Sequence, residues 1–326
     1  MIIGGAEDKL RKRTILKEFV SACGGSDAKI AVIPTASSLG PEVVEVYDAL
    51  FRREGAGKVV PVRPATREDA HDPDLVKILG DVTGIFMTGG NQLKLSAIIC
   101  GTPLGDEIVA AHERGVVVAG TSAGASIQSS HMVAFGGPGS TPKQRMTQVA
   151  AGLGLLESSV IDQHFDQRNR YGRLLMIVSQ SPQLLGIGID EDTAAVVEHV
   201  VLPGADDPHE VLRVIGRGAV TIFDPARITT NAFEAKRSTP LLASNVVLHV
   251  LPEGHAFDLT TRTLVPTRTA VDPSEAAEMA AAGSDLRQLA RDIAAADASP
   301  TSLKRRLARS RGRAPRDPHQ QDGATS

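Results

Sequence analysis

The stretch Val116-Val117-Val118-Ala119-Gly120-Thr121-Ser122-Ala123-Gly124-Ala125 joins a candidate buried strand to a candidate helix. Its apolar run ends at a Gly-x-Ser-x-Gly pentapeptide, and small residues follow that can begin a helix. This order is typical of a nucleophile elbow, a sharp strand-to-helix turn that exposes a serine hydroxyl. It makes Ser122 the candidate nucleophile and the amide of Ala123 a candidate donor to an oxyanion. A plain glycine-rich turn is the alternative, because the pentapeptide also arises by chance.

On the amino-terminal side of this stretch, short apolar runs alternate with a helical pattern. The runs that predict strands are 30–33, 59–62 and 84–88. Apolar residues at helical spacing predict a helix between Gly40 and Gly55. Fully apolar strands that alternate with amphipathic helices indicate an α/β protein with a mostly parallel sheet covered on both faces. The first strand, 1–3, is so short that we expect either an edge strand or a strand whose start lies upstream.

The carboxyl-terminal half is richer in antiparallel signals. The runs that predict strands there are 185–189, 194–200, 211–215 and a hairpin-like pair, 246–250 and 257–264. We expect one α/β domain over residues 1–271. From 272 to 326 we expect an Ala-rich helix followed by an Arg-rich, disordered tail whose charges are solvated.

Composition and charge narrow the class of protein. Hydrophobic residues make up 42% of the 326 residues and charged residues 22%, which is ordinary for a soluble globular protein. A net charge of −3 offers no general reason to bind nucleic acid or an anionic membrane, and no apolar run approaches the ~20 residues that span a bilayer. The first residues show no signal-peptide pattern, so we expect a cytoplasmic protein whose two cysteines, Cys23 and Cys100, are free thiols.

A catalytic serine needs a base, and the chain offers nine histidines. His164 stands out because it follows an apolar run and begins a dense polar segment, 162–173. Loops at the carboxyl ends of strands are where open α/β sheets place their sites. His131 is nearest in sequence, but nine residues along a helix would put it roughly 13 Å from Ser122. A solvated polar loop is the alternative interpretation of the segment.

Three acids, Asp190, Glu191 and Asp192, lie where one predicted strand ends and the next begins. An acid in this place can orient the imidazole and stabilise its cation. A polar turn between two strands also commonly carries Asp and Gly. The residues alone do not decide among the three acids.

A second glycine pair, in Thr88-Gly89-Gly90-Asn91-Gln92, follows the predicted strand 84–88. Glycines let the backbone present amides closely, so we expect Gly90 and Asn91 to join Ala123 in an oxyanion site. Asn91 and Gln92 add neutral polar contacts for a substrate amide.

Three arginines, Arg168, Arg170 and Arg173, follow His164 closely and predict an anionic substrate, because guanidinium binds carboxylate in bidentate fashion. Phosphate is the competing anion, but the chain has neither a Walker loop nor a Gly-x-Gly-x-x-Gly fingerprint. No His, Cys or Asp spacing supports a metal site.

Five motifs, taken together and in order, resemble those of the cyanophycinase family, serine exopeptidases related to aspartyl dipeptidase. The motifs are 3–9, 88–92, 120–125, 162–165 with its arginines, and 188–191. The resemblance runs from Ile3 to about Leu264. It implies a three-layer fold of the flavodoxin-like or class I glutamine-amidotransferase-like type, a homodimer, and no metal or organic cofactor.

The resemblance also implies a substrate. Cyanophycin has a poly-aspartate backbone with arginine attached to each side-chain carboxyl by an isopeptide bond, and β-Asp-Arg is the product. Ser122 falls on the nucleophile position and His164 on its base. The residues that fall on substrate-contact positions are Gln92, Asp162, Gln163, Arg168, Arg170 and Arg173. We expect the arginines to bind the substrate's carboxylates and Asp162, with Gln163 and Gln92, to receive its guanidinium.

The chain departs from the family at one point. The family places a triad acid shortly after the elbow helix, whereas 136–141 holds no carboxylate here. Either Glu191 supplies the orienting acid, or the catalytic pair works with weaker orientation.

The alternative functions are an aspartyl dipeptidase or isoaspartyl-peptide hydrolase of the same family, an esterase of the α/β-hydrolase type and a non-enzymatic binding module. The esterase normally orders its triad Ser, acid, His, whereas the best acid here follows the histidine. A glutamine amidotransferase would need Cys at position 122.

Overall fold

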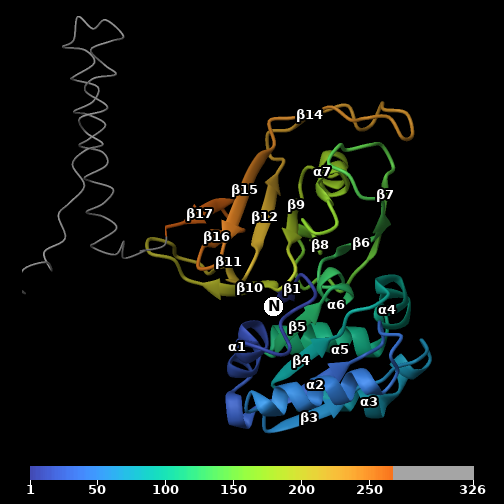
Figure 1. Ribbon diagram of the computed structural model, residues 1–326, viewed down its shortest axis with the longest axis vertical. Coiled ribbons are helices and arrows are strands. Elements are labelled where there is room, and N and C mark those ends of the chain that lie inside the picture. The colour runs from blue at the N-terminus through green and yellow to red at the C-terminus, as the bar shows by residue number, and fades with distance from the viewer. Residues whose placement is uncertain (267–326) are drawn as a thin grey trace, which may run out of the picture. The chain divides into compact units, whose positions relative to one another are not determined.

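The computed structural model describes residues 1–266. The expected tail, 272–326, lies outside the described residues, and so does the end of the expected domain. Within residues 1–266 the largest sheet has nine strands in the order β17-β16-β11-β10-β1-β5-β4-β2-β3 (Figure 1). No helix in this part of the chain combines the length and hydropathy of a membrane span.

The large sheet has a parallel half and an antiparallel half. The parallel strands, in spatial order, are β1 (Ile2–Ile3), β5 (Val117–Thr121), β4 (Gly84–Met87), β2 (Lys29–Ile33) and β3 (Lys58–Pro61). The antiparallel extension is β10 (Thr193–Val200), β11 (His209–Gly216), β16 (Ala256–Asp258) and β17 (Thr263–Val265). The predicted α/β class with a large sheet, parallel through its amino-terminal strands, is confirmed.

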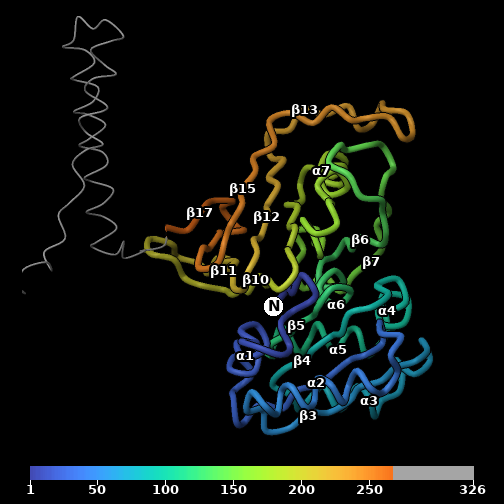
Figure 2. The backbone as a smooth tube through the Cα atoms, viewed as in Figure 1, coloured from blue at the N-terminus to red at the C-terminus, as the bar shows by residue number. Residues whose placement is uncertain are grey.

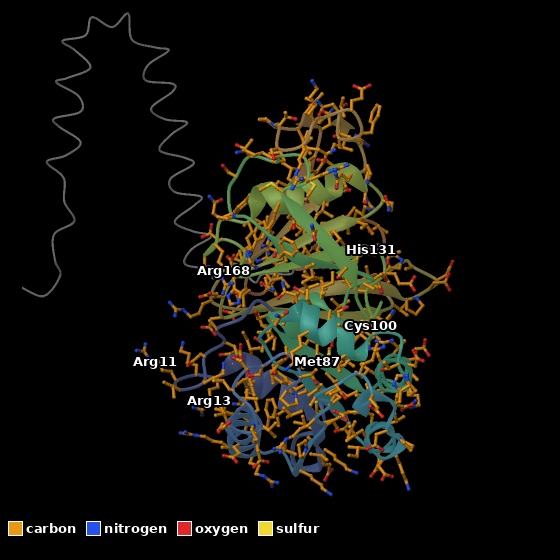
Figure 3. The ribbon with its side chains drawn as sticks, turned by 90° about the vertical axis from the view of Figure 1, so that its right-hand side faces the viewer. Arg11, Arg13, Met87, Cys100, His131 and Arg168 are labelled. Carbon is orange, nitrogen blue, oxygen red and sulfur yellow. The ribbon has the colours of Figure 1, made fainter. Side chains whose placement is uncertain are left out.

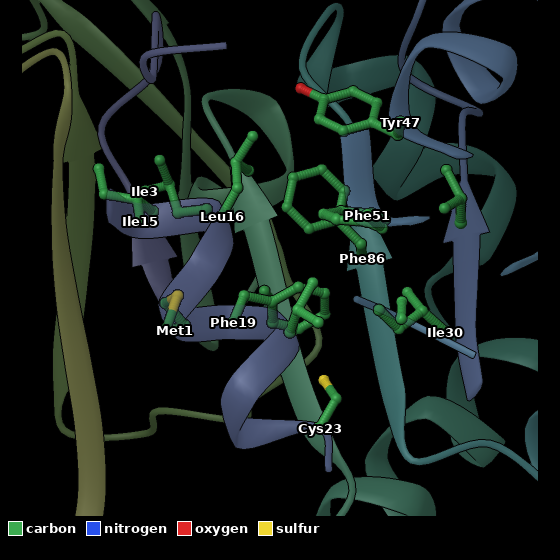
Figure 4. Packing of buried hydrophobic residues seen from close by; sticks show 14 of the residues in the cluster. Met1, Ile3, Ile15, Leu16, Phe19, Cys23, Ile30, Tyr47, Phe51 and Phe86 are labelled. Atoms are coloured by element: carbon green, nitrogen blue, oxygen red, sulfur yellow. The ribbon is translucent and has the colours of Figure 1, made fainter. Parts of the chain in front are cut away.

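Helices cover both faces of the parallel half. On one face lie α1 (Thr14–Ala22) and α2 (Glu42–Arg53), and on the other α3 (Pro73–Leu79), α4 (Gln92–Ile99) and α5 (Pro103–Glu113). The strands read as apolar throughout because alternate side chains enter different cores: in β2, Ile30 packs with the first pair of helices and Ile33 with the second group. The first core centres on an aromatic cluster in which the ring centroids of Tyr47 and Phe86 lie 4.6 Å apart (Figure 4).

A second sheet packs against the antiparallel half. Its strands are β15 (Val247–Pro252), β12 (Ala219–Asp224), β9 (Leu185–Ile189) and β8 (Ser159–Gln163), of which only β8 and β9 run parallel. Helix α7 (Tyr171–Gln180) covers its outer face, and Ile161 and Ile187 join Leu212 and Phe257 between the two sheets. Figure 2 shows that the chain leaves this sheet after β12 and returns to it at β15, which is drawn in orange.

The remaining elements are short. They are the 3-10 turns η1 (Gly25–Asp27) and η2 (Asp69–His71), helix α6 (Ala123–Ser126), and the strand pairs β6 (His131–Gly136) with β7 (Thr147–Ala151) and β13 (Thr229–Thr230) with β14 (Ala243–Ser244).

Of the two alternatives expected for the strand 1–3, the structure excludes an edge strand, because β1 pairs with both β5 and β10. The predicted hairpin does not form: β15 pairs with β12 in the second sheet, whereas β16 pairs with β11 and β17 in the first. Long-range pairing decided both outcomes, and local pattern does not report it.

The helix after Ser122 is also much shorter than expected. Helix α6 ends at Ser126, and His131 begins β6, so the chain does not carry His131 along a helix. In Figure 3 His131 and Arg168 lie on opposite sides of the view.

Candidate active site

Ser122 occupies a strained turn between β5 and α6. Its φ of 53° and ψ of −105° are unusual for a residue with a side chain, and its amide donates to the carbonyl of Ile3 at 3.0 Å. The turn is so tight that a Cβ on Gly120 would lie 2.1 Å from the carbonyl oxygen of Gly124. Small residues at these positions therefore permit the elbow that the sequence predicts.

Three loops bring Ser122, His164 and Glu191 together. The Oγ of Ser122 lies 2.9 Å from Nε2 of His164, and Nδ1 of His164 lies 2.6 Å from Oε1 of Glu191. These residues follow β5, β8 and β9, each at the carboxyl end of its strand. With Nδ1–H donating to Glu191, Nε2 is left with a lone pair that faces the serine hydroxyl.

The two neighbouring acids have other partners. Asp190 accepts hydrogen bonds from the amides of Asp166, at 3.1 Å, and Ala219, at 3.0 Å. Asp192 accepts one from the amide of Asp8 at 2.8 Å. Both therefore brace the turn, and Glu191 is the acid that contacts the imidazole.

The surroundings of His164 favour its neutral form. Burial lowers the pKa of His164 below its ordinary value of 6.5, and the charges of Arg168 and Arg170 lower it further. The hydrogen bond and charge of Glu191 oppose this shift without reversing it. A neutral imidazole near pH 7 is the state that can accept a proton from serine.

The segment after β1 supports this arrangement. Gly5 has a φ of 101°, and a Cβ there would lie 2.3 Å from Cε1 of His164. The carbonyl of Gly4 accepts the amide of His164 at 2.8 Å, and that of Gly5 accepts the amide of Asp192 at 2.9 Å. Reasoning from residue types missed this role, although a Gly-Gly pair directly after a two-residue strand is a visible signal of close backbone approach.

Glu7 is a second residue that residue types did not single out. Its buried carboxylate accepts hydrogen bonds from Thr121 Oγ1 at 2.6 Å, Tyr47 Oη at 2.6 Å and Lys9 Nζ at 2.7 Å. Burial alone would raise the pKa of Glu7, but Lys9 and the two hydroxyl donors outweigh it and hold the pKa below its ordinary value. Because Thr121 precedes the nucleophile, this network holds the end of β5.

The amides expected at the oxyanion site differ in their availability. The amides of Gly89, Gly90 and Ala123 donate no hydrogen bond to any of residues 1–266. Asn91 is a correction: its amide donates to the carbonyl of Ala36 at 2.9 Å, and its side chain caps α4. Gly89 lies against the nucleophile, since a Cβ there would be 3.3 Å from that of Ser122.

The polar cluster of Asp162, Arg170 and Arg173 is closed on itself. Arg173 donates to both carboxylate oxygens of the fully buried Asp162, including Nε to Oδ2 at 2.5 Å, and to the carbonyl of Gly136 at 3.1 Å. Arg170 donates to Asp162 at 3.2 Å and to Gln163. Burial lowers the pKa of Arg170 to about 10, with Asp162 opposing the shift, so its guanidinium stays charged near neutral pH.

This closure overturns one expectation. The carboxylate of Asp162 already receives two guanidinium groups, so it is not free to receive a third from a substrate. Gln92 is also engaged, since its Nε2 donates to the carbonyl of Ala134 at 2.8 Å. Arg168, by contrast, is exposed and makes no ion pair with residues 1–266.

A cavity of about 590 Å³ opens beside Ser122. Its walls come from Thr88 and Gly89 after β4, from Glu7 and Lys9 after β1, and from the first turns of α2. Within the described part of the chain, no cluster of three or more His, Cys, Asp or Glu could hold a metal ion. The hydroxyl of Ser122, in contact with His164, thus lies at the edge of an open cavity.

Comparison with known proteins links this geometry to a family. A family model described as peptidase family S51 matches residues 1–200, which include Ser122, His164 and Glu191. A cyanophycinase from Nostoc sp. is 41% identical over 269 residues, which cover 82% of this chain and 87% of that protein. One from Geminocystis herdmanii is 40% identical over 265 residues, or 80% of this chain and 93% of that protein. A solved peptidase structure from an acI-B1 actinobacterium is 23% identical and covers 76% of this chain and 95% of its own, with a TM-score of 0.49.

Proposed function

Because the chain belongs to peptidase family S51, we propose that it is a serine exopeptidase that hydrolyses cyanophycin to β-Asp-Arg dipeptides. One observation carries the proposal: Oγ of Ser122 lies 2.9 Å from Nε2 of His164, whose other nitrogen contacts Glu191. The similarity to cyanophycinases supports the choice of substrate.

The bond that is cleaved follows from the product. β-Asp-Arg keeps its isopeptide bond, so the enzyme hydrolyses the main-chain amide between aspartyl units. The oxygen of Ser122 attacks the carbonyl carbon, and His164 takes the hydroxyl proton and returns it to the leaving nitrogen. Water then attacks the resulting acyl-enzyme by the same route in reverse, with Glu191 stabilising the imidazolium in both steps.

The oxyanion needs amides that are not already bonded. We assign this role to the amide of Ala123, at the start of α6, together with that of Gly89 or Gly90. Arg168 is exposed beside His164 and is suited to a substrate carboxylate. Arg170, Arg173, Asp162 and Gln163 act mainly by holding the loop that carries His164, since their hydrogen bonds are made within the protein.

We propose a fold of the flavodoxin-like or class I glutamine-amidotransferase-like type, which the parallel order β3-β2-β4-β5-β1 with helices on both faces supports. From the resemblance to cyanophycinases we also propose that the protein is a cytoplasmic homodimer and that it works without a metal or organic cofactor.

The test is incubation of the purified protein with cyanophycin and mass analysis of the products. We expect β-Asp-Arg from the wild type and none from a Ser122→Ala variant. A serine-reactive fluorophosphonate probe should label the wild type at Ser122. Hydrolysis of α-linked aspartyl dipeptides in preference to the polymer would instead support the dipeptidase function.

A further inference from the structure

The cavity beside Ser122 has a wall that the proposed mechanism does not use. We call the whole cavity, with the residues that line it, the α2 cavity. Val43, Val46 and Tyr47 of α2, together with Leu39, form an apolar side. Leu39 and Val46 remain 66% and 47% exposed. Exposed apolar side chains beside a nucleophile can cover the hydrocarbon part of a ligand.

The charges on the α2 cavity leave one carboxylate uncompensated. Glu7 and Lys9 neutralise each other at 2.7 Å, and Lys9 also lies over the Tyr47 ring, 5.5 Å from its centroid. Figure 4 shows the Tyr47 hydroxyl directed away from the Phe51 and Phe86 rings, and this hydroxyl donates to Glu7 at 2.6 Å. Glu42, in the first turn of α2, lines the cavity and makes no ion pair with residues 1–266. The net charge of the lining therefore favours a cation.

A buried hydroxyl provides an independent sign of a ligand. Thr88 lines the same cavity and is 1% exposed, and its Oγ1 has no hydrogen-bond partner within residues 1–266. A buried polar atom without a partner costs free energy, which a polar group of a bound ligand can recover.

We propose that the α2 cavity is the subsite that holds an arginyl side chain of the substrate. The methylene stem lies on Val43 and Val46, the guanidinium pairs with Glu42, and the Thr88 hydroxyl hydrogen-bonds the isopeptide amide at the start of the stem. This inference rests on the proposed function, because arginine is attached through the aspartyl side chain, a few bonds from the amide that Ser122 attacks. The other acid expected to receive a guanidinium, Asp162, is already occupied by Arg170 and Arg173.

The first test compares two glutamates of the same helix. Glu42 and Glu45 are both exposed in the first turn of α2, but only Glu42 lines the cavity. Glu42→Gln therefore removes a charge at the cavity, and Glu45→Gln removes one outside it. Both variants lose the same helix-dipole contribution, so they are matched for folding. On cyanophycin, Glu42→Gln should lower kcat/KM about fivefold through KM, and Glu45→Gln should leave it unchanged. Equal kinetics for the two variants would overturn the subsite.

The second test changes the ligand instead of the protein. A synthetic (β-Asp-Arg)₃ fragment is compared with the same fragment carrying citrulline, which keeps the shape of arginine without its charge. The difference between wild type and Glu42→Gln should be lost with citrulline, and its persistence would contradict the pairing. Thr88→Val should raise KM for both fragments while probe labelling of Ser122 stays at the wild-type rate. An unchanged KM in Thr88→Val would remove Thr88 from the subsite.

Failure of the proposed function can be distinguished from failure of the subsite. If wild type hydrolyses neither cyanophycin nor the fragment, the proposed function fails. Binding of the arginine fragment to Ser122→Ala protein, measured by calorimetry, then tests the subsite alone. Weaker binding after Glu42→Gln but not after Glu45→Gln supports the subsite, and equal binding overturns it.

Discussion

Two charged clusters adjoin the catalytic loops, one on the loop of His164 and one against Thr121 beside Ser122, and their charges have different partners. The cluster of Asp162, Arg170 and Arg173 after β8 is buried, and its ionic groups bind one another. The cluster of Glu7 and Lys9 after β1 lies beside a cavity that reaches Ser122. The Asp162 cluster belongs to the segment with the most closely spaced charges in the sequence. The Glu7 cluster, however, lines the cavity that a substrate can enter. Charge density along a chain thus does not say whether the charges face a ligand or each other.

Replacing the nucleophile should have the largest effect. Ser122→Ala removes only a hydroxyl, so the fold should be kept while hydrolysis of cyanophycin falls about 10⁴-fold or more. His164→Ala should be nearly as damaging, and the double variant no worse than either, because the two residues act as a unit. Turnover numbers for the three variants check this. A Ser122→Ala enzyme that keeps a tenth of its rate would refute the assignment of Ser122 as the nucleophile.

The closed cluster should matter most for stability. Asp162→Ala leaves the guanidinium groups of Arg170 and Arg173 buried without their carboxylate, which should cost about 3–5 kcal/mol of the free energy of unfolding. Asp166→Ala, an exposed acid on the same loop, is the control and should change stability by less than about 0.5 kcal/mol. Urea titration measures both. A stable Asp162→Ala variant with a raised KM would mean that this cluster binds substrate after all.

Much of the architecture was predictable because short-range patterns of apolar residues indicate where its strands lie. The strand predicted at 185–189 is β9 without a shift, and the loops that hold Ser122 and His164 follow strands as expected. The pairing of β15 with β12 was not predictable, because it depends on a strand far away in sequence.

Within the site, the sequence predicted which residues come together better than it predicted which hydrogen bonds they make. Ser122, His164 and Glu191 lie in contact, as the pattern suggested they could. The engagement of the Asn91 amide by Ala36 and the closure of Asp162 depend on tertiary packing. Glu7 was missed for the same reason, since its partners Thr121 and Tyr47 are distant along the chain.

The orienting acid should have an intermediate effect. Glu191→Gln keeps the shape of the side chain but loses the charge that stabilises the imidazolium, so kcat should fall about 10²-fold with little change in stability. Asp192→Asn, which alters a neighbouring acid away from the imidazole, is the matched control and should stay within a few-fold of wild type. Steady-state kinetics decide the matter. Normal activity in Glu191→Gln, beside an inactive Asp190→Asn, would transfer the role to Asp190.

The smallest expected effect tests the one exposed arginine of the motif. The positive charge of Arg168 lowers the pKa of His164, so Arg168→Gln should raise that pKa. Only the neutral imidazole accepts the serine proton, and activity is therefore lost as pH falls through the pKa of His164. In Arg168→Gln this loss should begin at a higher pH than in wild type. The rate of fluorophosphonate labelling of Ser122 across pH measures the shift without any substrate carboxylate, so loss of binding does not enter the result. Arg53→Gln, an exposed arginine at the end of α2, should leave the profile where it is. If Arg168→Gln left the profile unmoved, or moved it to lower pH, Arg168 would not lie within electrostatic reach of His164.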